Sequence, residues 1–277
     1  VSLRQMPSAP MSGPLWMEIL PVNTTHLTVK LSPCYPETAN ALLTYYVGNG
    51  REICMGLMRQ SLPTFIISFI ILIVGIYMLG YWLLVCKSED VDATLLYLGL
   101  FSVILGLWTA NETDFAKLLL VNQHATTFAA YILLMAMPIP FVLFVRSFLD
   151  FDDKNIWRVF CGFSMVMCVI SCVLHFTGIW ELRQSLILTH IVIVGLLIYL
   201  MRAIVFKFVK RQVGRRLRTC IAALILVILA SIADLINYYK VGGNTGIWGR
   251  ISFLIFIVIL GVESASKIGR ASCRERV

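Results

Sequence analysis

Residues 62–86 read LPTFIISFIILIVGIYMLGYWLLVC, and this stretch decides the fold class. It contains 25 residues and no charged side chain. About 30 Å of hydrocarbon is crossed by roughly 20 helical residues, so the stretch is long enough to span a membrane. Because lipid offers no partner for exposed backbone groups, the predicted form of this segment is an α-helix.

Six further apolar stretches follow, and each is also long enough to cross a membrane. The seven predicted spans are residues 62–86, 93–111, 125–148, 157–178, 184–206, 217–239 and 248–266. The composition agrees, because 59% hydrophobic and 14% charged residues lie well outside the range of soluble domains. We therefore predict an all-α polytopic membrane protein, with a seven-helix transmembrane bundle over residues 61–266.

Two of these spans carry local signals. Pro138 and Pro140 lie in the later half of the third span, where they should kink the helix. The second span places Gly99, Ser102 and Gly106 on one face, which allows a neighbouring helix to approach closely. We interpret this small-residue face as ordinary packing within the bundle.

Residues 1–60 have a different character. LWMEIL (15–20), HLTVKLSP (26–33) and LLTYYVGNG (42–50) resemble short strands, the last ending in a Gly-rich turn. Three strands are too few for an independent sheet, so residues 1–60 are expected to be the C-terminal part of an extracytoplasmic β-domain. Cys34 and Cys54 share this region, and a disulfide between them is left open.

Residues 267–277 are expected to have a different origin from the rest of the chain. IGRASCRERV (268–277) is the translation of a common sequencing adapter, so residues 267–277 are expected to be an adapter-derived, non-native tail. The alternative is a basic segment that binds anionic lipid. On the adapter interpretation the gene continues after Ser266, and the remaining chain carries 20 basic and 14 acidic residues, a net charge of +6 rather than +8.

The charges between the spans predict the orientation. If the N-terminus is outside, the inner loops carry eleven basic residues, seven of them between Arg202 and Arg218, and the outer loops carry four. The outer four are Lys117, Arg183, Lys240 and Arg250. By the positive-inside rule, the chain is expected in the cytoplasmic (inner) membrane, with its C-terminal end in the cytoplasm.

Polar and ionisable side chains gather in the outer halves of the spans, and ionisable groups there are functional candidates by default. The candidate residues for an outward-facing ligand pocket are His190, Asp234, Asn237, Asn111, Glu112, His124 and His175. His190 and Asp234, on the fifth and sixth spans, are predicted to share one cavity. The alternative role for the whole set is hydrogen bonding between helices.

The chemistry-bearing motifs that an enzyme would need are not found in the sequence. No HxxxH or ExxH spacing suggests a metal site, and no nucleophile, P-loop or paired-carboxylate motif is present. We therefore expect no cofactor, no metal and no catalytic residue in the visible chain.

Two stretches carry a family resemblance. LLYLGLFSVILGLWTANE (95–112) and MPIPFVLFVR (137–146), with the β-rich region before them, resemble bacterial seven-transmembrane receptors with diverse intracellular signalling modules. The resemblance covers about residues 15–266 and is greatest to clostridial-type members linked to GGDEF domains. It implies a carbohydrate-binding-like β-sandwich outside, seven helices, and a cytoplasmic output domain such as a diguanylate cyclase or a histidine kinase.

The leading hypothesis is thus a fragment of a sensory receptor that signals to a missing output domain, most simply a diguanylate cyclase. A histidine-kinase-type output, a transporter and a membrane-embedded enzyme are the alternatives. The expected partners are membrane lipid, a small extracytoplasmic ligand and the missing signalling domain, with a homodimer left open. Nucleic acid is not an expected partner, because a basic loop between spans is explained by orientation alone.

Overall fold

The structure is a computed structural model that describes residues 49–85, 93–113, 115–116, 123–149, 155–180, 184–209, 215–241 and 248–260. The labelled helices in chain order are α1 (Gly50–Val85), α2 (Thr94–Asn111), α4 (Gln123–Ala136), α5 (Pro138–Leu149), α6 (Ile156–Phe176), α7 (Leu186–Val209) and α8 (Arg215–Val241). One more helix, Trp248–Leu260, follows and is called helix 248–260 below. No strand occurs in these ranges.

The predicted helical membrane bundle is confirmed. Among the described residues, five segments are long and apolar enough to cross a membrane, and two shorter apolar helices fall on the sixth and seventh predicted spans. The five are Gly50–Leu84, Thr94–Asn111, Ala125–Leu149, Ile156–Phe176 and Leu186–Lys207; the shorter two are Ile221–Asn237 and Trp248–Leu260. Large hydrophobic side chains are exposed on the outer faces of these helices, as expected where lipid is the solvent.

The start of the first helix differs from the prediction. α1 begins at Gly50, so residues 50–60, which the sequence analysis grouped with the β-rich region, are helical in the structure. The Asn49 side-chain oxygen accepts a hydrogen bond from the Arg51 N–H at 3.1 Å, which satisfies one free donor at the helix start. Cys54 lies in this added part as a free thiol. The remainder of the predicted β-region, with Cys34, lies outside the described residues.

The predicted kink in the third span is confirmed as a break between two helices. α4 ends at Ala136 and α5 begins at Pro138, with Met137 between them. The Met137 N–H still donates to the Leu133 carbonyl at 3.0 Å, but Pro138 has no N–H to continue the series. Proline is well tolerated in the first turn of a helix, so the same residue ends α4 and begins α5.

The small-residue face of α2 packs against α1, as predicted. A Cβ atom on Gly106 would lie 2.9 Å from the Leu72 backbone nitrogen, and one on Gly75 would lie 2.8 Å from the Val103 nitrogen. A Cβ on Gly99 would meet the Leu79 side chain at 2.9 Å. Only glycine permits the two backbones to approach this closely.

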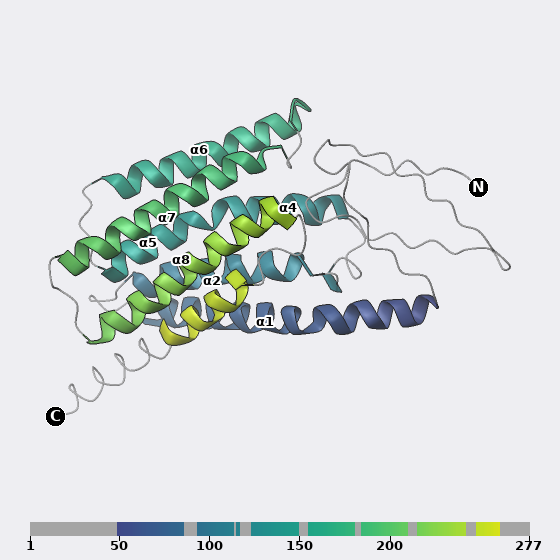
Figure 1. Ribbon diagram of the computed structural model, residues 1–277, viewed down its shortest axis with the longest axis horizontal. Coiled ribbons are helices and arrows are strands. Elements are labelled where there is room, and N and C mark those ends of the chain that lie inside the picture. Colours follow the sequence, from purple (N-terminus) through teal and green to yellow (C-terminus); the bar gives the residue numbers. More distant parts are fainter. Residues whose placement is uncertain are drawn as a thin grey trace.

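The helices follow one another across the bundle in a simple order. α1 packs on α2, α2 on α4 and α5, and α5 on α6 and α7, which also contact each other. Figure 1 shows this succession, with α1 on one side of the molecule and α6 and α7 on the other. Aromatic rings fill the centre, where Phe101 of α2 lies 4.6 Å from Phe141 of α5 and 5.3 Å from Phe253 of helix 248–260, between ring centres.

A cationic and aromatic contact joins the last turn of α5 to the first turn of α6. The guanidinium carbons of Arg146 and Arg158 lie 4.4 Å and 5.2 Å from the centre of the Trp157 ring system. Both distances fall within the range of cation–π attraction. At the other end of α6, Gly178 adopts a positive φ of 70°, and the Ile179 and Trp180 N–H groups donate back to the Leu174 carbonyl, which ends the helix.

Candidate functional site

Three charged side chains lie near one another at one end of the bundle, and we call Glu112, Asp234 and Arg250 the charge cluster. Glu112 is the residue that closes α2, Asp234 lies two turns before the end of α8, and Arg250 is in the first turn of helix 248–260. Both carboxylates act electrostatically on the Arg250 guanidinium. The cluster therefore connects α2 to two consecutive helices, α8 and helix 248–260, that are far from it in the sequence.

Asp234 is bound to the start of the next helix. Its Oδ2 atom accepts a hydrogen bond from the Gly249 N–H at 2.6 Å. The first N–H groups of a helix have no partner within the helix, and the helix dipole favours a negative charge at that end. A Cβ on Gly249 would lie 2.7 Å from the same Oδ2, so the contact requires glycine at this position. The carboxylate thus holds α8 to helix 248–260.

Arg250 is buried, which is unusual for an arginine. Only 9% of its surface is exposed, and its guanidinium carbon lies 5.8 Å from the centre of the Trp108 ring of α2. Arginine is rarely buried in a membrane span without a carboxylate or an aromatic face nearby, and here both are present. The predicted assignment of Arg250 to an outer loop is wrong, because the residue is helical and packed inside the bundle.

Two polar atoms of the charge cluster are buried without a hydrogen-bond partner among the described residues. They are Nε of Arg250, a donor, and Oδ1 of Asp234, an acceptor. An unsatisfied buried group costs about 1 to 3 kcal/mol, more when it is charged. The arrangement can lower its free energy by binding a small polar molecule that both accepts and donates, or by a helix shift that brings Arg250 and Asp234 into contact.

Asn111 is placed beside the charge cluster, with a structural contact. Its Nδ2 atom donates a hydrogen bond of 2.6 Å to the Thr126 carbonyl of α4. This bond fixes the end of α2 against the start of the third span, and so it fixes the position from which Glu112 leaves the helix. Asn237, one turn beyond Asp234 on α8, is half-buried.

The predicted histidines lie on α4, α6 and α7, which are not the helices that carry the charge cluster. His175, at the end of α6, stacks on Phe128 of α4 with 5.9 Å between the ring centres, and it also contacts Phe176. His190 is half-buried in α7, and His124 is in the first turn of α4. Asp234 interacts with Gly249 and Arg250, and the shared cavity of His190 and Asp234 stays a prediction.

Arg250 and Trp108 are the site residues that the sequence analysis missed. The sequence contained a signal for Arg250, because it lies within the predicted span 248–266 and an arginine inside a span is a functional candidate. It was overlooked because the charge was counted for orientation instead. In the residues that the structure describes, no group of three or more His, Cys, Asp or Glu side chains lies close enough to hold a metal ion.

Comparison with known proteins gives one match. A family model described as 7TM diverse intracellular signalling matches residues 62–264, well over half of the chain. The match begins at the first predicted span and ends within the seventh, and it includes all three residues of the charge cluster. No curated protein and no solved structure matches the chain.

Proposed function

Because this chain belongs to the 7TM diverse intracellular signalling family, we propose that it is the membrane part of a sensory receptor that controls a cytoplasmic output domain. The chain is a multi-pass membrane protein of a signalling family, and the family match over residues 62–264 is the observation that carries this proposal. Receptor function needs a site on one side of the membrane and a structural path to the other. The charge cluster and the helices that leave it supply both.

The proposed orientation places the charge cluster on the outer side of the cytoplasmic membrane. The support is the excess of basic residues at the opposite end of the bundle, including Arg146 in the last turn of α5 and Arg158 in the first turn of α6. The proposed signal is a small extracytoplasmic ligand. The proposed output is a diguanylate cyclase, in keeping with the GGDEF-linked members that the chain resembles, and enzyme activity then belongs to that domain rather than to the bundle.

The proposed mechanism is a shift between two arrangements of α8 and helix 248–260. A ligand changes such an equilibrium only by binding one state more tightly than the other. In the described arrangement, Arg250 Nε and Asp234 Oδ1 have no hydrogen-bond partner among the described residues and can bind a ligand. A direct hydrogen bond between the two side chains would satisfy both atoms and leave none for the ligand. A ligand that hydrogen-bonds to both atoms therefore stabilises the described arrangement, in which the two side chains are not bonded to each other. α8 runs from Arg215 to Val241, so a change in its tilt at Asp234 also moves its start at Arg215, at the opposite end.

The test is the output of the full-length receptor in a bacterial host that lacks other diguanylate cyclases. Arg250→Gln and Asp234→Asn each remove one charge of the cluster and keep a similar side-chain shape. We expect each to change the basal cyclic di-GMP level at least about fivefold, the lower end of ordinary coupling between sites. Phosphotransfer measured in the same membranes would distinguish a histidine-kinase output from a cyclase.

Two matched control variants are available at the start of α1. Arg51→Gln and Glu52→Gln remove the same charges at exposed positions, and they should leave the basal output unchanged. Membrane levels of all four variants are compared by immunoblotting. If Arg250→Gln and Asp234→Asn signal like the controls at equal membrane levels, the charge cluster has no part in signalling.

A further inference from the structure

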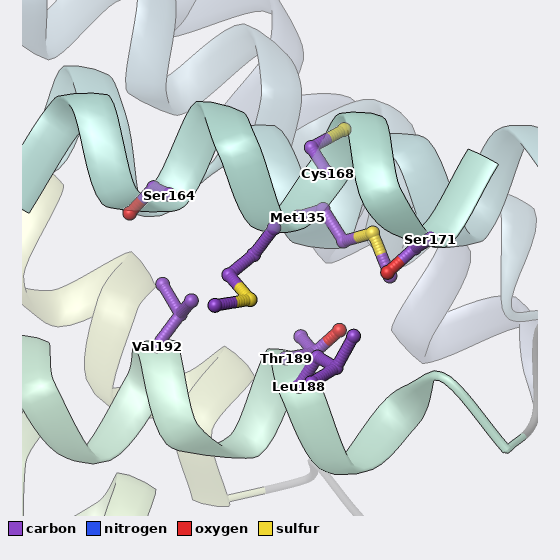
Figure 2. A pocket seen from close by; sticks show the side chains of 8 residues that line it. Met135, Ser164, Cys168, Ser171, Leu188, Thr189 and Val192 are labelled. Atoms are coloured by element: carbon purple, nitrogen blue, oxygen red, sulfur yellow. The ribbon is translucent and has the colours of Figure 1, made fainter. Parts of the chain in front are cut away.

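A small cavity lies between α4, α6 and α7, away from the charge cluster. Its volume is about 10 Å³. The eight lining residues are Met135, Ser164, Met167, Cys168, Ser171, Leu188, Thr189 and Val192. Figure 2 shows the Met135 side chain entering the space between α6 and α7 from α4. Three of the lining side chains carry a hydroxyl group, although the site is inside the bundle.

These three hydroxyl groups are fully buried and unsatisfied. Ser164, Ser171 and Thr189 are exposed by 1%, 0% and 2%, and none of their side-chain oxygens has a hydrogen-bond partner in the described part of the molecule. Among the described residues, Ser102 and Ser185 are also buried without a partner, whereas two serines of α1 are satisfied by the helix backbone. Ser61 and Ser68 of α1 donate to the carbonyls four residues earlier, at 2.9 Å and 2.6 Å. The hydroxyl groups at the cavity are therefore available to a ligand inside it.

The size of the cavity and the hydroxyl groups on its wall identify that ligand. A cavity needs about 10 to 15 Å³ to hold one water molecule. Five of the eight lining side chains are apolar, so the hydroxyl groups are what would bind water, since water satisfies buried polar groups that have no other partner. No larger molecule fits without moving the helices.

We propose that one buried water molecule bridges Ser171 Oγ of α6 and Thr189 Oγ1 of α7. Figure 2 shows these two hydroxyl groups directed toward each other across the gap between the helices. Ser164 precedes Ser171 by two helical turns, about 10 Å along α6, so the same water cannot reach it. The water ties α6 to α7 at one point of an otherwise apolar contact, independently of the charge cluster and of the proposed receptor function.

Thermal unfolding of the full chain in lipid nanodiscs tests the bridge by a double-mutant cycle. Ser171→Ala and Thr189→Val each remove one partner of the water, so each should lower the unfolding temperature. The double variant should unfold at the same temperature as the less stable of the two single variants, because the water bridge is already lost in each single variant. Ser164→Ala is the matched control, and its effect should add to that of Thr189→Val.

Three results would overturn the proposal. A higher or unchanged unfolding temperature for Ser171→Ala or Thr189→Val means that the hydroxyl group was buried dry. Additive effects of Ser171→Ala and Thr189→Val mean that the two groups share nothing. If the effects are non-additive, a high-resolution cryo-electron microscopy map decides, since density for a water within hydrogen-bond distance of both oxygens supports the bridge, and a direct Ser171–Thr189 hydrogen bond excludes it.

Discussion

Replacing Gly106 by alanine tests the closest approach of two helices in the bundle. The added Cβ would lie 2.9 Å from the Leu72 nitrogen and 3.0 Å from its Cα. Ordinary contact begins at 3.4 Å, so α1 and α2 would have to separate by about 0.5 Å. The obstructing atoms belong to the backbone of α1, which cannot rotate away as a side chain would. Overpacking of this kind costs about 1 to 3 kcal/mol.

Gly80→Ala is the matched control for this substitution. Gly80 is also helical, and a Cβ there meets nothing within 4 Å. In both variants, replacing glycine by alanine in a helix interior contributes the same stabilisation, about 0.5 to 1 kcal/mol. The difference between the two variants therefore isolates the overpacking, and we expect Gly106→Ala to be the less stable by about 1 to 3 kcal/mol.

The assay is equilibrium unfolding of the purified protein in mixed micelles, followed by tryptophan fluorescence. The free energies of unfolding of the two variants are compared directly, each against the unsubstituted chain. Equal values for Gly106→Ala and Gly80→Ala would refute the close backbone approach of α1 and α2.

Two further predictions concern the ends of the spans. Asn111→Ala removes the hydrogen bond from Nδ2 to the Thr126 carbonyl and should lower the free energy of unfolding by about 0.5 to 1.5 kcal/mol in the same assay; no loss would mean that water replaces the bond. Reporter fusions should place the loop 207–218 in the cytoplasm and the loop 112–124 outside, and the opposite labelling would overturn the proposed orientation.

The positions of the helices along the chain were predictable because lipid imposes a simple rule. A spanning segment must be apolar, helical and of sufficient length. The predicted span 93–111 accordingly differs from α2 by one residue, and Pro138 marks the break in the third span. α1 extends upstream to Gly50 because hydropathy records the part of a helix inside lipid, and a helix can continue beyond that part.

The neighbours of each polar side chain were less predictable. Asp234 and His190 were expected to meet, since consecutive spans are often adjacent and their depths agree. That pairing stays a prediction, because depth gives no information about rotation around the helix axis. The bond that Asp234 accepts from the Gly249 N–H was not predicted at all. That acceptor role depends on where helix 248–260 begins, which no periodicity in the sequence specifies.

The pair of arginines over Trp157 fixes the depth of one end of the bundle. A guanidinium resists being drawn into hydrocarbon, and tryptophan favours the level of the lipid headgroups, so this contact favours a fixed depth for the end of α5 and the start of α6. The charge cluster lies at the opposite end of the helices. Movement of α5 or α6 along the membrane normal is therefore opposed at the end that contains Trp157. A displacement at the charge cluster is expected to reach that end as a change in helix tilt.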